Sequence, residues 1–115
     1  MDMRLMIVDD NAGMREMVRD AICTSEDTVM ECADGTDAVL HYDTFKPAVV
    51  LMDVEMRYMD GFTAAERILS IDPAARIIFV SSHNTSAFRL KANRLRAAGF
   101  VSKENLSELQ NLIHH

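Results

Sequence analysis

The chain has 115 residues, 49% of them hydrophobic and 26% charged, with a formal net charge of −6. This length and balance fit one globular domain over residues 1–115 and leave no room for a second. The acidic excess argues against nucleic-acid binding by this chain, and no apolar run is long enough to cross a membrane. We therefore expect a soluble, cytoplasmic protein whose partners are proteins or small ions.

Short apolar runs recur along the chain and predict β-strands covered on both faces. They lie at residues 4–9, 28–33, 48–53, 76–82 and 99–103. Each run is followed by a segment with helical spacing of apolar residues. This alternation, (βα)5, predicts an α/β fold with a doubly wound, five-stranded parallel sheet.

Start and stop signals place the helices between these strands. The first helix follows Asn11, a candidate N-cap, and the second ends before Lys46-Pro47, while residues 34–35 are interpreted as a turn. The third follows Gly61 and stops near Asp72-Pro73. The fourth lies within 84–96, and the closing helix is predicted over 104–113.

Reactive side chains stand where four of the predicted strands end: Asp9, Asp10, Asp53, Ser81 and Lys103. The carboxyl ends of parallel strands meet at one edge of a sheet, so these groups should converge. Clustered carboxylates are hard oxygen ligands for Mg²⁺. A carboxylate can also act as a nucleophile, and Asp53 is the candidate for an aspartyl-phosphate, with Lys103 and Ser81 placed to neutralise and hold the phosphoryl oxygens.

The segments "IVDD", "VVLMDVEM", "MDG", "IIFVSS" and "GFVSK" resemble, in order and over the whole chain, the receiver domain of two-component response regulators. The resemblance implies a flavodoxin-like receiver with strand order 2-1-3-4-5. It also implies that Asp53 accepts a phosphoryl group from a sensor histidine kinase or phosphotransfer protein, and that the domain signals by altered binding of a downstream protein. Mg²⁺ would be held by Asp10, Asp53 and the backbone carbonyl of Glu55, with Asp9 acting mainly through bound water.

The same resemblance makes Ser81 the switch hydroxyl, Phe100 the switch aromatic and Lys103 the phosphate-pairing residue. The predicted fourth helix lies beside these residues and is basic on an otherwise acidic chain. It is either a solvated face or a docking surface for an acidic partner. Its basic residues are Arg89, Lys91, Arg94 and Arg96.

Three positions depart from the pattern of the family. Arg57 replaces a usual proline near the phosphoacceptor, which removes a fixed φ. Glu104 replaces the proline that follows the lysine through a cis peptide, so we expect either a trans bond or stored strain. Arg96 replaces a common glycine and makes the end of the fourth helix less certain.

Two other functions stay open at this stage. One is a Mg²⁺-dependent phosphohydrolase that works through an aspartyl-phosphate, although the D-x-D motif and cap domain typical of such enzymes are missing. The other is a receiver-like docking module without phosphoryl turnover. The leading interpretation is a signalling switch that catalyses only its own phosphoryl transfer and autodephosphorylation, either as a stand-alone chemotaxis-type receiver or as part of a longer regulator.

The remaining candidate residues have simpler interpretations. Cys23 and Cys32 are expected to be buried apolar residues and the nine methionines mainly gap-fillers in the core. His83 is interpreted as a solvated loop residue that could overhang the site. His114 and His115 could be the remnant of a purification tag.

Overall fold

The computed structural model describes residues 3–113, and its centre is a five-stranded parallel sheet. The strand order is β2-β1-β3-β4-β5, which confirms the predicted doubly wound, flavodoxin-like fold. The strands are β1 (Arg4–Val8), β2 (Thr28–Cys32), β3 (Val49–Asp53), β4 (Ile77–Ser81) and β5 (Gly99–Ser102). Each predicted strand is found within one or two residues of its expected bounds.

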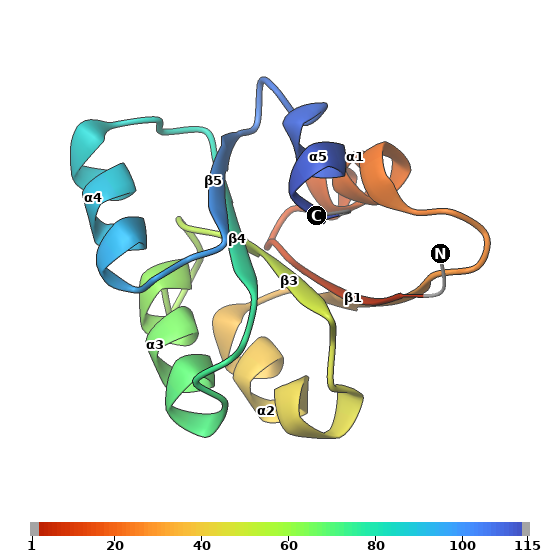
Figure 1. Cartoon of the computed structure of the whole chain (residues 1–115), viewed down its shortest axis with the longest axis horizontal. Helices are drawn as coiled ribbons and strands as arrows, with labels where there is room; N and C mark the ends of the chain where they lie inside the picture. The colour runs from red at the N-terminus through yellow and green to blue at the C-terminus, as the bar shows by residue number, and fades with distance from the viewer. Residues whose placement is uncertain (1–2, 114–115) are drawn as a thin grey trace.

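Helices cover both faces of the sheet (Figure 1). They are α1 (Ala12–Ile22), α2 (Gly35–Phe45), α3 (Gly61–Ile71), α4 (Ser86–Arg94) and α5 (Glu108–Ile113). One core cluster lies between the sheet and α1 and α5, and the other lies between the sheet and α2, α3 and α4. Successive strand residues alternate between the two clusters, as Leu5 and Met6 do, which explains the continuous apolar runs.

The core also accounts for the sulfur-containing residues. Met6 and Met52 are fully buried, and Met56 and Met59 pack against the same cluster, so the interpretation as gap-fillers holds for these methionines. Cys32 is buried and Cys23 is only partly buried. Burial raises the pKa of the Cys32 thiol to about 12, which keeps it protonated and unreactive.

Side-chain caps fix where the helices begin. Asn11 accepts a hydrogen bond from the Met14 N–H, which confirms it as the N-cap of α1. The interpretation of residues 34–35 as a turn was wrong, because Asp34 accepts from the Asp37 N–H at 2.7 Å and α2 begins at Gly35.

The closing helix is shorter than predicted. The chain turns after β5 through hydrogen bonds from the Glu104 N–H to Ser102 Oγ and from the Asn105 N–H to the Ser102 carbonyl, so α5 begins only at Glu108. Every described peptide bond is trans, including that between Lys103 and Glu104. Arg96 ends α4 with a φ of 58°, in the left-handed region that glycine adopts most easily.

Within residues 3–113, the structure contains no helix with the length and apolar character needed to cross a membrane.

Candidate functional site

Three aspartates meet at the carboxyl edge of the sheet, as predicted. Asp9 follows β1 and Asp53 ends β3, and both are almost fully buried, whereas Asp10 is exposed. One carboxylate oxygen from each of Asp9, Asp10 and Asp53 lies within 4.8 Å of the others. Such a set of hard oxygen donors, with one side open to solvent, fits a small divalent cation such as Mg²⁺.

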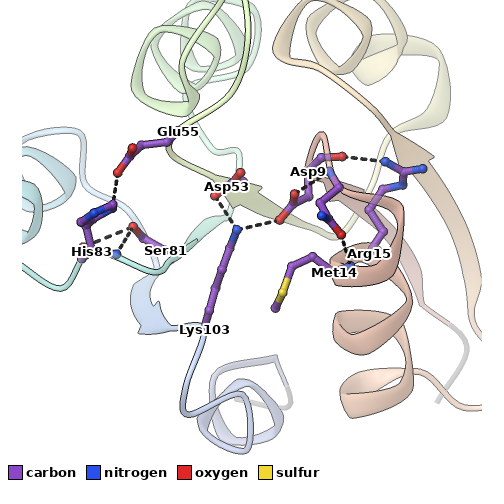
Figure 2. Close-up of polar contacts among 9 residues, drawn as sticks. Asp9, Met14, Arg15, Asp53, Glu55, Ser81, His83 and Lys103 are labelled. Atoms are coloured by element: carbon purple, nitrogen blue, oxygen red, sulfur yellow. Dashed lines mark hydrogen bonds and ion pairs between the residues drawn. The ribbon is translucent and has the colours of Figure 1, made fainter.

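Lys103 lies between the two buried carboxylates (Figure 2). Its Nζ is 3.0 Å from Asp9 Oδ2 and 3.0 Å from Asp53 Oδ1. The lysine follows β5, and its backbone N–H donates to the Ser81 carbonyl, which ties it to the end of β4. The ammonium group thus partly compensates two negative charges that the fold takes out of water.

Burial and neighbouring charges have opposing effects on the pKa values of Asp53 and Lys103. The pKa of Asp53 is raised to about 6, mainly by burial and also by the neighbouring charges of Asp9 and Asp10, while Lys103 acts in the opposite direction. Burial lowers the pKa of Lys103, but its hydrogen bonds to Asp9 and Asp53 outweigh this effect and hold that pKa above its usual value. Asp53 is therefore ionised at neutral pH but at a cost in stability, which an added cation would relieve.

Asp9 is held by contacts that the sequence did not predict. Its Oδ1 accepts from the Asn11 N–H at 2.9 Å, and its backbone carbonyl accepts from Nη1 of Arg15 at 2.8 Å. Arg15 lies one turn into α1, and its Nε donates to Glu31 on β2. The only signal for this role is that Arg15 is a basic residue close after two acids, which is too common to be diagnostic.

Ser81 is buried beside the aspartates but faces the loop that follows it (Figure 2). Its hydroxyl donates to the His83 carbonyl at 3.2 Å and accepts from the His83 N–H at 3.0 Å. Nδ1 of His83 contacts Oε1 of Glu55, so the two loops that flank the site touch at its mouth. The His83 side chain is 58% exposed, which fits the expectation of a solvated residue that overhangs the site.

Phe100 is half-buried on β5, and the guanidinium carbon of Arg89 lies 5.0 Å from the centre of its ring. Arg89 also donates from Nε to Asn84 in the loop before α4. Lys91 of the same helix points elsewhere, since its Nζ lies 5.1 Å from the centre of the Phe62 ring of α3. The predicted basic face of this helix is therefore divided between β5 and α3.

Arg57 stands at the rim of the site in an exposed turn. Its carbonyl accepts from the Met59 N–H at 2.7 Å, and Tyr58 between them has a φ of 68° and is 95% exposed. A left-handed conformation is unfavourable for a residue with a large side chain. Arg57 thus lies in a tight, strained turn beside Asp10 and Asp34.

The fold and this cluster define a flavodoxin-like α/β protein with an acidic ligand site at the carboxyl edge of its sheet. The chain belongs to the response regulator receiver domain family, whose sequence pattern matches residues 5–114. It is therefore a phosphorylation-regulated signalling switch of the two-component type.

Relatives of known identity agree with this assignment. The chain is 38% identical to the chemotaxis protein CheY of Thermotoga maritima over 104 residues, which cover 90% of this chain and 87% of that protein. It is 33% identical to a protein-glutamate methylesterase/protein-glutamine glutaminase of Methanococcoides burtonii, but the match covers only 33% of that protein. A two-component response regulator of the LuxR family from an Aurantimonas species superposes with a TM-score of 0.91 at 35% identity, over 99% of this chain and 84% of the other.

Proposed function

We propose that Asp53 is the residue that carries the phosphoryl group and that residues 1–115 act as one receiver domain. The observation that carries the proposal is the position of Lys103, whose ammonium lies 3.0 Å from Asp53 Oδ1 at the open edge of the sheet. A cation so placed neutralises charge on an entering phosphoryl group. The Asp53 side chain is also ionised above its pKa of about 6, as a nucleophile must be.

The proposed transfer is a displacement at phosphorus. A carboxylate oxygen of Asp53 forms the new P–O bond while the P–N bond to the donor's phosphohistidine breaks, and the imidazole leaves with the electron pair. In autodephosphorylation, water attacks phosphorus, and the P–O bond to Asp53 breaks to release inorganic phosphate. Lys103 has the same task in both steps, which is to stabilise the charge on the phosphoryl oxygens.

The residues present fit Mg²⁺ because the three aspartates offer hard oxygen ligands within 4.8 Å of one another. We infer that Asp10, Asp53 and the backbone carbonyl of Glu55 hold the ion, and that Asp9 contributes through bound water. When bound, the ion would neutralise negative charge on the aspartates and on the phosphoryl group. The Glu55 side chain takes no part, since it contacts His83.

Ser81 is proposed to report the phosphoryl group to the surface. To reach a phosphoryl oxygen on Asp53, its hydroxyl has to give up the two hydrogen bonds that it makes with the backbone of His83. The loop before α4 then loses its anchor, and Phe100 can turn toward the space beneath it. A downstream protein can distinguish the two states at the face formed by β4, α4 and β5.

The partners follow from this chemistry. The phosphodonor is a sensor histidine kinase or a phosphotransfer protein, and the similarity to the chemotaxis protein CheY supports a signalling partner rather than a chemical substrate. We propose a cytoplasmic protein that catalyses no reaction beyond its own phosphoryl transfer and autodephosphorylation.

Incubation with acetyl phosphate, with and without Mg²⁺, tests the proposal. The wild type should gain one hydroxylamine-labile phosphoryl group in the presence of Mg²⁺, and Asp43→Asn, which alters an exposed aspartate on α2, should behave identically. Asp53→Asn should not be labelled. Rapid release of phosphate from many phosphoesters without an adduct would support the phosphohydrolase. If the protein is not labelled and releases no phosphate, the docking module is supported instead.

A further inference from the structure

The helices α3 and α4 lie on the same side of the sheet (Figure 1). A groove lined by residues of both helices, and by none of the three aspartates, runs between them. Its first part is a hollow of about 420 Å³ beside the ends of the two helices. Three residues of its α3 side have the i, i+3, i+4 spacing of a single helix face, and a proline just after the helix extends that side: Glu66, Leu69 and Ser70, followed by Pro73. The other side comes from Arg94, Leu95 and Arg96 at the end of α4.

The second part is a hollow of about 500 Å³ along α4. Its residues on this helix have the same spacing: Ala87, Leu90, Lys91 and Arg94. Glu66, Arg94 and Leu95 line both hollows, so the two form one continuous surface, which we call the α3–α4 groove. Each of the two helices thus contributes one face of side chains to the same open groove.

The α3–α4 groove is lined by leucine side chains and flanked by basic ones. Leu69 and Leu95 are partly buried, and Leu90 keeps 51% of its surface exposed although it is a large hydrophobic residue. Three bases, Lys91, Arg94 and Arg96, stand against the single acid Glu66, on a chain whose net charge is −6. An exposed leucine among bases on an acidic protein is typical of an interaction surface rather than of a solvated helix.

The backbone at the end of the groove supports this interpretation. Arg96 lines the groove with a φ of 58°, a conformation that a residue with a side chain rarely adopts. Glycine would be more favourable at this position, so Arg96 stands against the local conformational preference. Strain of this kind is concentrated at positions where the side chain has a use.

We propose that the α3–α4 groove docks an acidic amphipathic helix of a partner protein. A helix is the expected occupant because two parallel side-chain stripes separated by a groove match the ridges of a third helix. Its apolar residues would cover Leu69, Leu90 and Leu95, and its flanking carboxylates would meet Lys91, Arg94 and Arg96. The groove shares α4 with the phosphorylation-dependent face, but it lies between α3 and α4, whereas Arg89 of α4 contacts Phe100 on β5. The proposed site is therefore additional to that face and is available in the unphosphorylated protein.

The test uses unphosphorylated protein and a synthetic helical peptide of about 15 residues, with leucines along one face and glutamates beside them. Titration of the ¹⁵N-labelled protein should give saturable amide shifts confined to α3, α4 and the residues that join α4 to β5. A peptide with glutamine in place of glutamate should bind about 10-fold more weakly, since the rim charges then lose their partners. Shifts centred on Phe100, or none that saturate, would overturn the proposal.

Matched variants separate the groove from general electrostatic attraction. Arg94→Glu should weaken peptide binding about 10-fold and Leu90→Ser by a similar factor, whereas Glu66→Gln should strengthen it about 2-fold by removing a repulsive charge. Lys46→Glu reverses a charge at the end of α2, outside the groove, and should leave affinity unchanged within about 2-fold. Equal weakening by Lys46→Glu and Arg94→Glu would contradict a defined site, and no outcome here depends on the chemistry of Asp53.

Discussion

Asp53 has to be both buried and ionised, and these two requirements oppose each other. It is 4% exposed, which keeps competing water away from the carboxylate, yet it has to be ionised to act as a nucleophile. The same burial raises its pKa to about 6, and the charges of Asp9 and Asp10 add to the effect. The fold thus holds the proposed phosphoacceptor in an ionised state that is unfavourable without a cation beside it.

This conflict predicts a pH-dependent gain in stability for Asp53→Asn in the absence of divalent ions. The folded protein holds a proton on Asp53 up to about pH 6, whereas the unfolded chain releases it near pH 4, so the contribution of Asp53 to stability is lost as the pH rises through this window. At about pH 7.5 the asparagine variant should be more stable by up to about 3 kcal/mol.

The measurement is urea unfolding of wild type and variant at about pH 4 and about pH 7.5. The gain should nearly vanish at the lower pH because Asp53 is then protonated in the folded protein. Asp43→Asn, at an exposed position, should change stability equally at both pH values. A destabilised Asp53→Asn at the higher pH would show that the ionised carboxylate is well compensated in the absence of metal.

At the level of elements, the position of Asp53 depends on how closely α3 begins beside the end of β3. The Gly61 N–H donates to the Val54 carbonyl at 2.7 Å, and a Cβ at Gly61 would lie 2.0 Å from the Asp53 carbonyl oxygen. Only glycine permits this approach. The first turn of α3 thereby fixes the backbone that carries Asp53.

Gly61→Ala should therefore destabilise the protein by at least about 2 kcal/mol, because the backbone of β3 or α3 has to shift. Gly13→Ala is the matched control, since Gly13 lies in α1 and its nearest contact would be a side-chain oxygen, Asn11 Oδ1, at 3.3 Å rather than backbone at 2.0 Å. That variant should stay within about 1 kcal/mol of the wild type. If the two variants unfold at the same urea concentration, the close approach at Gly61 does not determine the stability of the fold.

The end of α4 gives the opposite prediction. Arg96→Gly should stabilise the protein by about 1 kcal/mol, since glycine adopts the left-handed conformation of this position without steric penalty. The same substitution removes one base from the rim of the α3–α4 groove. Chemical denaturation measures the gain, and a loss of stability would mean that contacts of the Arg96 side chain outweigh its backbone strain.

The sequence predicted the sheet, its helices and the converging aspartates because apolar periodicity and strand-end residues are local signals. It did not predict that α5 begins four residues late, since the turn through Ser102 and Asn105 uses polar contacts with no periodic pattern. Nor could it place the Glu55 side chain on His83, because side-chain pairing between two loops depends on their spacing in the folded chain. The division of the basic residues of α4 between two faces required the orientation of the helix.

For the whole molecule, the switch needs more energy than one hydrogen bond supplies. Shifting a population from about 1:99 to 99:1 requires about 5.5 kcal/mol, whereas a hydrogen bond to a charged group contributes about 1.5–3 kcal/mol. Ser81 also has to break two bonds to His83 before it reaches the phosphoryl group. In the proposed switch, the metal ion, Lys103 and the bound partner would therefore supply the remainder.

Ser81→Ala is accordingly predicted to separate phosphorylation from signalling. The variant should still be labelled at Asp53. It should lose most of the phosphorylation-dependent NMR shifts at Phe100 and α4, because it lacks the hydroxyl that would move to bind the phosphoryl group. Ser82→Ala, the exposed neighbour, should behave as the wild type. Wild-type shifts across that face in Ser81→Ala would assign the trigger to another group.

The central claim is that Asp53, and neither of its two acidic neighbours, carries the phosphoryl group. Reduction of the Mg²⁺- and acetyl phosphate-treated protein with borohydride converts an acyl phosphate to homoserine, which peptide mass spectrometry locates in the chain. Homoserine at position 53 alone is the predicted result. Homoserine at position 9 or 10, or at no position in protein that has taken up phosphate, would contradict it.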